Sequence, residues 1–475
     1  MPEDRLSLLF QTSSCRPGGP TNGVTETLVE PTNIRFGGGA SATLLHPLVA
    51  VAMALAIILI LCLPRKYVMV PLLLTIFLTP AGQVVVLAGV HFYVARILIL
   101  TALARWAVSG RSSPLAGGFN SIDRFFALWA LYTLVVTSLQ WMLQPLIKNL
   151  GDFLDAMGGY FVLRFLIHDR EDVTRAIKVL ALVAMIMAPF MLNEQITHRN
   201  IFGLLGGVAL EPAVRDGRIR SQATFEVYIT AGVFGASLLP LFIWLWTSGK
   251  SKVVACLAVV SSTIITLTSH SSTPTLAYAA GIVGLCFWPL RGRMRAFRWG
   301  IALTLTALHV AMKAPVWALI ARVDLTGSSS GYQRFLLVDT CIRHFWDWWL
   351  LGAKDYNKWG FDMWDLSNQY VAYAVTGGLL SLVLFIGVIS SGFSRLGTAR
   401  KRVAGDRGQE WFLWCLCAAL LSHVVAYFGI GYFDQIKLAW FTLLAIISVA
   451  TVEAAPSRTM QPMFDLDLAP SHSAT

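Results

Sequence analysis

Long apolar segments separated by short polar gaps make up most of this sequence. Each is close to the roughly 20 residues that an α-helix needs to cross a bilayer. The pattern predicts an all-α polytopic membrane bundle of about 12–13 transmembrane helices. Pro64, Pro71 and Pro80 interrupt the first apolar zone, so twelve spans are an alternative to thirteen. The predicted spans are about 44–63, 68–86, 89–107, 125–143, 150–168, 176–193, 224–246, 253–268, 272–290, 299–316, 369–391, 411–429 and 435–452.

Polar sequence is confined to the two ends of the chain and to two longer loops. Residues 1–43 are rich in Gly, Thr and Pro, and residues 453–475 are also polar, so we predict a disordered tail at each end of the membrane domain 44–452. The longer loops are about 194–223 and 317–367. Loops of this length are usually functional in compact proteins. The second one holds six of the sixteen tryptophans: Trp317, Trp346, Trp348, Trp349, Trp359 and Trp364.

Composition and charge support a membrane protein and disfavour a nucleic-acid partner. Hydrophobic residues make up 56% of the chain and charged residues 13%, with a mean hydropathy of +0.64. A soluble domain carries roughly 25% charged residues. The net charge of +11 arises mainly from alternate polar gaps, as expected for cytoplasmic loops, which places the two longer loops on the external side. The basic gaps contain Arg65–Lys66, Arg105 with Arg111, Arg170 with Arg175, Lys250 with Lys252, Arg291 to Arg298 and Arg395 to Arg407.

The first external loop ends in GRIRSQATFE, residues 217–226, where Arg218 and Arg220 directly precede a span. A guanidinium can bind two phosphate oxygens at once, so these arginines are candidates for an anionic ligand. Arginines at the end of a span also extend to lipid headgroups, which is the structural alternative. External arginines run against the usual charge bias, and this favours a ligand.

The second external loop contains a predicted amphipathic helix within residues 328–356. Arg334, Leu337, Cys341, Phe345 and Trp348 recur at helical spacing. We expect short interfacial helices here, with tryptophans toward lipid or a glycan. Arg334 would lie near a helix N-terminus, where backbone N–H groups favour an anion. The alternative is an interfacial helix with an aromatic belt and no ligand.

Several familiar chemistries are missing from the sequence. It contains no Walker-type phosphate loop, no paired-histidine metal motif and no G-x-S-x-G elbow. Its seven cysteines show no disulfide or zinc spacing. Asp465 and Asp467 form one Asp-x-Asp pair, but it lies in the predicted C-terminal tail. The sequence therefore predicts no metal and no cofactor.

Charged residues within the predicted spans are few. Arg96, Asp152 and Asp155 enter spans, and Asp434 and Lys437 stand three residues apart, close enough to pair across one helical turn. Charges at such depths usually pair or line a cavity. A coupled transporter would carry more of them at mid-span, so the pattern weighs against transport.

Four segments, in order, resemble the O-antigen ligase and polysaccharide polymerase superfamily of bacterial envelope enzymes. HFYVARILILTALARW at 91–106 resembles the arginine-bearing early span, and RSQATFEVYITAGVFGASLLPL at 220–241 resembles the span after the first external loop. LTSHSSTPTLAYAAGIVGL at 267–285 is similar to the Ser/Thr-rich start of the next hairpin helix. GYQRF, LLGAKDY and WDLSNQYVAYAVTGGLL, between 331 and 380, resemble the large loop and the span after it.

The resemblance implies a function as well as a fold. It implies about twelve spans in the bacterial inner membrane and an active site on the periplasmic face. The donor would be an undecaprenyl-diphosphate-linked glycan, passed without a metal to a lipid or glycan acceptor. Arg220 and Arg334 correspond to the arginines taken to hold the diphosphate, with Arg218 beside them. Aromatic side chains of the second loop would contact the glycan: Trp348, Trp349, Trp364 and Tyr370.

One departure from the family concerns the catalytic base. Related ligases carry His-Asn where this sequence has Ser367 and Asn368, and an unactivated serine is not a base at neutral pH. Asp365 is the nearest carboxylate and the first candidate base, with His344 second. Asn368 could act in catalysis, or Asn368 or Ser367 could cap the following helix. The departure favours polymerase-like transfer at least as much as ligation to lipid A core.

Two other functions remain open at the level of the sequence. A lipid-linked glycan flippase or polysaccharide transporter would have a charge-lined cavity through the membrane. An envelope scaffold would bind a glycan through the second loop without consuming a lipid-linked substrate.

Overall fold

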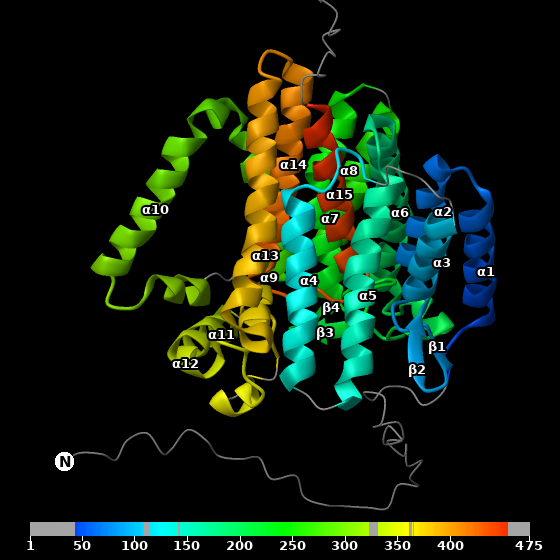
Figure 1. The fold of residues 1–475 in the computed structure, drawn as a ribbon, viewed down its shortest axis with the longest axis horizontal. Helices are drawn as coiled ribbons and strands as arrows, with labels where there is room; N and C mark the ends of the chain where they lie inside the picture. The colour runs from blue at the N-terminus through cyan, green and yellow to red at the C-terminus, as the bar shows by residue number, and fades with distance from the viewer. Residues whose placement is uncertain are drawn as a thin grey trace, which may run out of the picture.

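The computed structural model describes residues 43–108, 115–140, 143–249, 251–322, 331–360, 363 and 365–454 of the 475-residue chain. Nearly all of the two predicted tails lies outside these residues, and so do Trp364 and the Asp465/Asp467 pair. The described residues form a helical bundle with two small hairpins (Figure 1).

Each of the thirteen predicted apolar segments contains a helix. The long helices are α1 (Pro47–Cys62), α2 (Arg65–Leu78), α3 (Val94–Val108), α4 (Ser121–Gln140), α5 (Leu143–Leu166), α6 (Arg170–Thr197), α7 (Tyr228–Thr247), α8 (Lys252–Thr268), α9 (Ser272–Cys286), α10 (Met294–Ala311), α13 (Gln369–Arg402), α14 (Arg407–Ala426) and α15 (Ile436–Glu453). Short 3₁₀ helices are η2 (Ile201–Leu205), η3 (Trp288–Arg293), η4 (Val316–Arg322) and η5 (Tyr356–Trp359).

The structure confirms an all-α bundle of the polytopic membrane type. Within the described residues, six helices are long and apolar enough to cross a membrane: α4, α6, α7, α13, α14 and α15. A seventh candidate is the pair formed by α9 and the segment Trp288–Ala311, bent by 74° at its break. The helices α1 and α8 are apolar but shorter.

Two predicted span boundaries are wrong: the end of the span at 68–86 and the start of the span at 89–107. Residues there form an antiparallel hairpin of β1 (Val84–Leu87) and β2 (Val90–Tyr93) instead of helix. Pro80 follows the end of α2, and Ala88 and Gly89 both have positive φ, which matches a tight two-residue turn between paired strands. A second hairpin, β3 (Ala213–Arg215) with β4 (Arg218–Arg220), turns at Asp216 and Gly217 in the same way.

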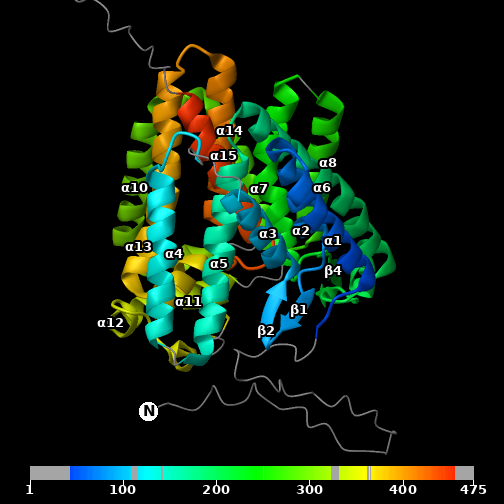
Figure 2. The same cartoon turned by 45° about the vertical axis from the view of Figure 1, so that its right-hand side comes forward.

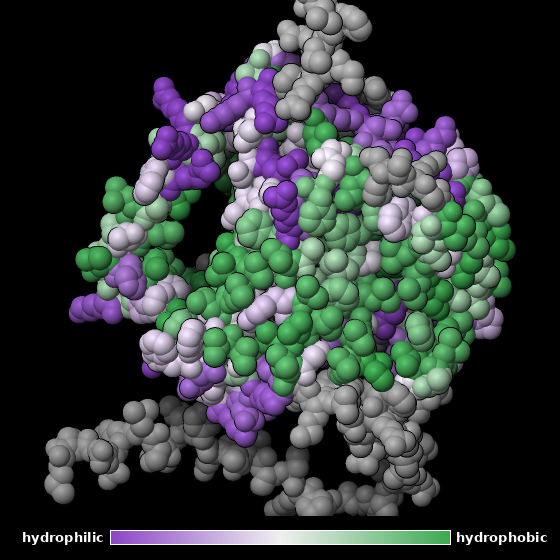
Figure 3. Space-filling view, viewed as in Figure 1, coloured by the Kyte–Doolittle hydropathy of each residue, from purple (hydrophilic) through white to green (hydrophobic). Residues whose placement is uncertain are grey.

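The bundle has two chemically different ends. One end, here called the loop end, carries both hairpins, α11 (Gly331–Arg343) and α12 (Phe345–Trp348); it is the lower end in Figures 1 and 2. The other, here called the basic end, carries the arginine- and lysine-rich gaps before α2, α6, α10 and α14. Figure 3 shows a mainly apolar surface between hydrophilic groups at the two ends. This is the surface expected of a bundle that crosses a bilayer.

Ion pairs inside the bundle join neighbouring helices. Arg164 of α5 and Asp123 of α4 lie 2.9 Å apart with fully buried side chains, and Tyr160 donates a hydrogen bond to the same carboxylate. Arg96 of α3 pairs with Asp155 of α5 at 2.6 Å. Arg96 and Asp155 thus pair, which is one of the two arrangements expected for charges within spans.

The second loop folds against the first half of α13. Gly331, Arg334, Leu337 and Cys341 form the buried face of α11, which matches the predicted spacing of Arg334, Leu337 and Cys341. Phe345 and Trp348, from the same predicted series, belong to the separate helix α12. Cys341 packs with Trp348, Val371 and Val375 in a small apolar cluster. The expectation that the tryptophans face lipid or glycan is therefore wrong for Trp348, which is buried in this cluster. In contrast to this docked loop, α10 has no buried residue and stands apart from the bundle in Figure 1.

Candidate functional site

Two arginines from different loops meet at the loop end. Arg220, on β4, donates a hydrogen bond to the Tyr228 hydroxyl at 2.6 Å, and its guanidinium lies 4.7 Å from the centre of the Tyr228 ring. Arg334, on α11, lies close enough to Tyr228 to interact with it electrostatically. Tyr228 opens α7 and stands between the first loop and the second. The two predicted diphosphate-binding arginines therefore both interact with Tyr228, Arg220 by direct contact and Arg334 through its charge.

Arg334 is buried without full compensation of its charge. Arg334 is only 7% exposed, and one of its guanidinium nitrogens donates a hydrogen bond to the Thr273 hydroxyl at 2.9 Å. Its Nε has no hydrogen-bond partner among the described residues. Burial lowers the pKa of Arg334, and the nearby Tyr228 and Asp365 offset part of that effect. An anion at this point would satisfy a buried donor and a buried charge together.

The strand that carries Arg220 is held in place by buried polar groups of α6. The Glu194 carboxylate accepts hydrogen bonds from the Gln222 and Ala223 backbone N–H groups at 2.7 and 3.1 Å. The Gln195 amide donates to the Ser221 hydroxyl at 2.7 Å and to the Thr268 carbonyl at 2.9 Å. These bonds tie the first loop to α6 and α8, so Arg220 is presented by a fixed backbone.

Arg218 and His270 lie beside this site. Arg218 is exposed at the start of β4. Burial lowers the pKa of His270, and the charges of Arg218 and Arg220 lower it further. The group of cations therefore extends from Arg220 toward the turn between α8 and α9.

The candidate bases differ in their distance from the arginines. Asp365 is half-buried and contributes to the electrostatics of Arg334. His344 follows the far end of α11, so ten residues at 1.5 Å per residue separate it from Arg334 by about 15 Å along the helix. It pairs with Asp347 at 2.8 Å and stacks on Trp359. The structure thus groups Asp365, and not His344, with the arginines.

Asn368 is the N-cap of α13. Its side-chain oxygen accepts hydrogen bonds from the Tyr370 and Val371 backbone N–H groups at 3.0 and 3.1 Å, and its amide donates to the Phe428 carbonyl. The capping interpretation is therefore confirmed for Asn368. Its hydrogen-bonding groups are used within the protein, and its catalytic role stays an untested prediction.

The predicted glycan-contacting aromatics are placed differently from one another. Trp348 is buried and its indole donates to the Cys341 carbonyl at 2.7 Å, so it is part of the core of the second loop. Trp349 is exposed next to it. Tyr370 is half-buried, donates to the Val424 carbonyl at 3.1 Å and packs on Phe428. Trp364 lies outside the described residues.

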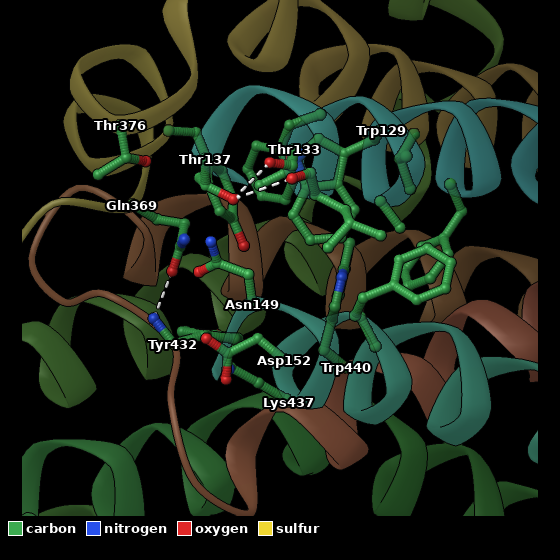
Figure 4. Close-up of a pocket in the computed structure, with 18 of the residues that line it drawn as sticks. Trp129, Thr133, Thr137, Asn149, Asp152, Gln369, Thr376, Tyr432, Lys437 and Trp440 are labelled. Carbon is green, nitrogen blue, oxygen red and sulfur yellow. Dashed lines mark hydrogen bonds between the residues drawn. The ribbon is translucent and has the colours of Figure 1, made fainter. Parts of the chain in front are cut away.

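A cavity of about 650 Å³ opens between α4, α5, α13 and α15, and the sequence did not indicate it as a site. Its lining combines aromatic rings with amides, hydroxyls and charged groups (Figure 4). Asn149, Asp152, Gln369 and Lys437 lie together on one side of it, and Trp129 and Trp440 lie farther along. Aromatic faces with neighbouring polar groups are the side chains that suit a sugar ring. Only the charges at Asp152 and Lys437 signalled this position in the sequence.

The cavity and the arginine site share a wall. The Thr273 hydroxyl, which accepts from Arg334, donates to the Gly429 carbonyl at 3.3 Å. Three residues later, the Tyr432 backbone N–H donates to the Gln369 side chain, which lines the cavity. The segment 429–432 therefore separates the arginine site from the cavity by only a few residues.

A smaller cavity of about 330 Å³ adjoins the first and shares Asp152, Lys437 and Phe441 with it. Arg96, Asp155 and Asp434 also line it. The expected Asp434–Lys437 ion pair is not among the ion pairs of the described residues. Asp434 instead accepts hydrogen bonds from the Glu226 and Ile436 backbone N–H groups and from Thr230.

No group of three or more His, Cys, Asp or Glu side chains is placed to hold a metal ion within the part of the chain that the structure describes. Comparison with protein-family models and with curated proteins finds no match for this chain. The resemblance to O-antigen ligases and polymerases therefore rests on the four motifs and remains a prediction.

Proposed function

We propose that the protein transfers or polymerises an undecaprenyl-diphosphate-linked glycan at the outer face of the bacterial inner membrane. The loop end would face outward and the basic end the cytoplasm, in keeping with the positive-inside rule. The thirteen apolar helices, short and bent ones included, would provide the twelve or thirteen spans. The observation that carries the proposal is the convergence of buried Arg220 and Arg334 on Tyr228.

The proposed reaction is an inverting, metal-independent transfer. The acceptor hydroxyl attacks the anomeric carbon of the donor sugar, and the bond from that carbon to the diphosphate oxygen breaks. The diphosphate leaves with the bonding electrons, and Asp365 takes the hydroxyl proton. Arg220 and Arg334 offset the negative charge that grows on the leaving group. Because both guanidinium groups are already held by Tyr228 or Thr273, little reorganisation is needed as this charge develops.

The cavity beside the arginines would hold the saccharide. Its volume falls in the range of about 300–1,000 Å³ that is common for small-molecule sites. Its charged groups Lys148, Asp152 and Lys437 come from the loop-end turns of α5 and α15, which supports entry from the outer face.

The proposal is tested by Arg334→Ala and Arg220→Ala in a strain that lacks the native gene. We expect either change to reduce surface polysaccharide synthesis about 10²–10³-fold, the scale for loss of one preorganised electrostatic donor. The matched control is Arg343→Ala on the same helix, because its side chain is 76% exposed. Polysaccharide profiles and protein levels are compared on gels. Full synthesis in both arginine variants would exclude the diphosphate assignment.

Asp365→Asn tests the base separately. We expect this change to abolish transfer, because it removes the group that accepts the hydroxyl proton. Donor binding should remain, because both arginines that hold the diphosphate are kept. Consumption of lipid-linked donor by purified protein is the measurement. Donor crossing the membrane without glycosidic bond formation would instead support a flippase.

A further inference from the structure

A third cavity lies at the opposite, basic end of the bundle. It has a volume of about 1,080 Å³ and opens between the first turns of α6, the last turn of α7, η3 and the first turns of α14. It is far from the arginine site of the loop end, since α6 and α7 run between the two ends (Figure 1). The proposed transfer reaction assigns no role to it.

The cavity gathers positive charge from two helices. Arg170, Arg175 and Lys178 come from α6, and Arg407 comes from α14. Arg175 is neutralised by Asp172 at 2.5 Å. Arg170, Lys178 and Arg407 are exposed and form no ion pair with any described residue. The negative groups nearby are Glu171, which lines the cavity, Asp169, the N-cap of α6, and Glu453, which interacts with Arg170. Asp406 is also close, and its carboxylate accepts hydrogen bonds from two N–H groups at the start of α14.

Tryptophans form the other wall of this cavity. Trp288 and Trp411 meet edge to face at 5.1 Å, and the Trp411 indole donates to the Thr247 hydroxyl at 2.9 Å. Trp244 packs on Phe412, beneath the Arg170 guanidinium. Tryptophan is enriched where membrane helices reach the headgroup region. The cavity thus combines an aromatic wall with cationic side chains from α6 and α14.

We infer that this cavity binds the phosphate headgroup of an anionic glycerophospholipid. Arg170 and Lys178 are eight residues apart on α6, so their stems are separated by about 12 Å along the helix, and Arg407 faces them from α14. Basic pockets between membrane helices on the cytoplasmic side recognise such headgroups. Topology alone requires basic residues at this end, but it does not require them to converge on one aromatic cavity.

The binding experiment uses the full-length protein, delipidated in a neutral detergent. Phosphatidylglycerol and phosphatidylcholine with identical acyl chains are titrated in turn, and bound lipid is counted by native mass spectrometry. We expect saturable binding of phosphatidylglycerol at least tenfold tighter than phosphatidylcholine. Equal binding of the two lipids would overturn the inference.

Two triple variants with equal charge change separate the cavity from the general charge of this end. Arg170→Gln, Lys178→Gln and Arg407→Gln together should weaken phosphatidylglycerol binding at least tenfold. The control combines Arg293→Gln, Arg295→Gln and Lys401→Gln, exposed positions at the same end but outside the cavity lining, and should bind as the wild type does. Equal losses in both variants would overturn the inference. If the cavity triple does not fold, Lys178→Glu against Lys401→Glu makes the same comparison with single exposed side chains.

A soluble anion is distinguished by competition. We expect glycerol phosphate and inorganic pyrophosphate, at concentrations equal to the lipid, to leave phosphatidylglycerol bound. Displacement by either would identify a site for a free phosphate compound and overturn the lipid assignment.

Discussion

Asn368 shows how one side chain in a suggestive sequence context can have a structural task. It is 1% exposed and directs its oxygen to the N–H groups at the start of α13. Ser367, its half-buried neighbour, provides no cap. The polar residues before α13 therefore have two different roles. Asn368 caps the helix, and Asp365 places a charge near Arg334.

Replacing Asn368 separates capping from chemistry. Asn368→Ala should lower the free energy of unfolding by about 0.5–2 kcal/mol, because two backbone donors lose their acceptor. Asn368→Asp should keep the stability, since aspartate caps equally well. Ser367→Ala is the neighbouring control and should change little. Denaturant titration in detergent measures all three. A normal stability in Asn368→Ala would show that the cap contributes nothing.

The Asp434 carboxyl group should make the free energy of unfolding depend on pH. Burial raises its pKa from 3.8 to about 7, although the Ile436 and Glu226 backbone N–H groups favour the ionised form. The folded protein therefore keeps a proton that the unfolded chain releases between about pH 4 and pH 7. The stabilising contribution of this group is complete below the unfolded pKa and is lost as the pH rises through about 7.

The comparison of wild type with Asp434→Asn at pH 5 and pH 8 isolates this contribution. We expect the wild type to lose more thermal stability between the two pH values than the variant does. Asp355→Asn, at an exposed side chain, is the control and should keep the wild-type difference. Identical pH dependences in wild type and Asp434→Asn would contradict a raised pKa.

At the scale of elements, a break in α13 joins the membrane helix to the second loop. Gly378 has φ 74° and ψ −179°, a conformation open to glycine and strained for other residues. The break lets the Leu379 N–H donate to the Trp349 carbonyl at 2.8 Å, and the Val375 carbonyl accept from Ala353 at 2.7 Å. The loop that carries Arg334 is thereby fixed to the helix that lines the cavity.

Two glycines of α13 test this connection. Gly378→Ala should destabilise the protein by about 1–3 kcal/mol, because the backbone would be strained, and its new Cβ would lie 2.6 Å from the Leu350 carbonyl oxygen. Gly397→Ala has open space around it and should be neutral or stabilise by up to about 1 kcal/mol. Thermal unfolding of the purified variants is the measurement. Equal effects of the two changes would argue against a conformational role for Gly378.

At the scale of the whole molecule, charge distinguishes the two ends more clearly than shape does. Buried Arg96, Arg220 and Arg334 and the cavities with Asp152 and Lys437 lie toward the loop end. Exposed arginines and lysines surround the basic end, where the buried Arg164 is neutralised by Asp123. By the positive-inside rule, we expect α11 and α12 on the external face, as the proposed function requires.

Accessibility of introduced cysteines tests this orientation. Trp346→Cys replaces a residue that is 78% exposed at the loop end and should react with a membrane-impermeant maleimide in intact spheroplasts. Lys401→Cys, at the basic end, should react only after permeabilisation. Labelling of the native cysteines gives the baseline. The reverse pattern would place the loop end in the cytoplasm.

The sequence by itself determined the class of protein, the thirteen helical segments and the segregation of basic residues, because hydrophobicity, helix length and charge are properties of neighbouring residues. It also indicated Arg220, Arg334 and the cap at Asn368 as candidates, through their places beside predicted helices and, for the arginines, through the family resemblance. It did not foresee the β1–β2 hairpin, because a short run of valines suits a strand and a helix equally well. Only the tertiary structure decided that Arg334 is buried near Tyr228 and that His344 lies away from this site. It also decided that α4, α5, α13 and α15 enclose a cavity. These features depend on contacts between residues far apart in the chain, which no local pattern encodes.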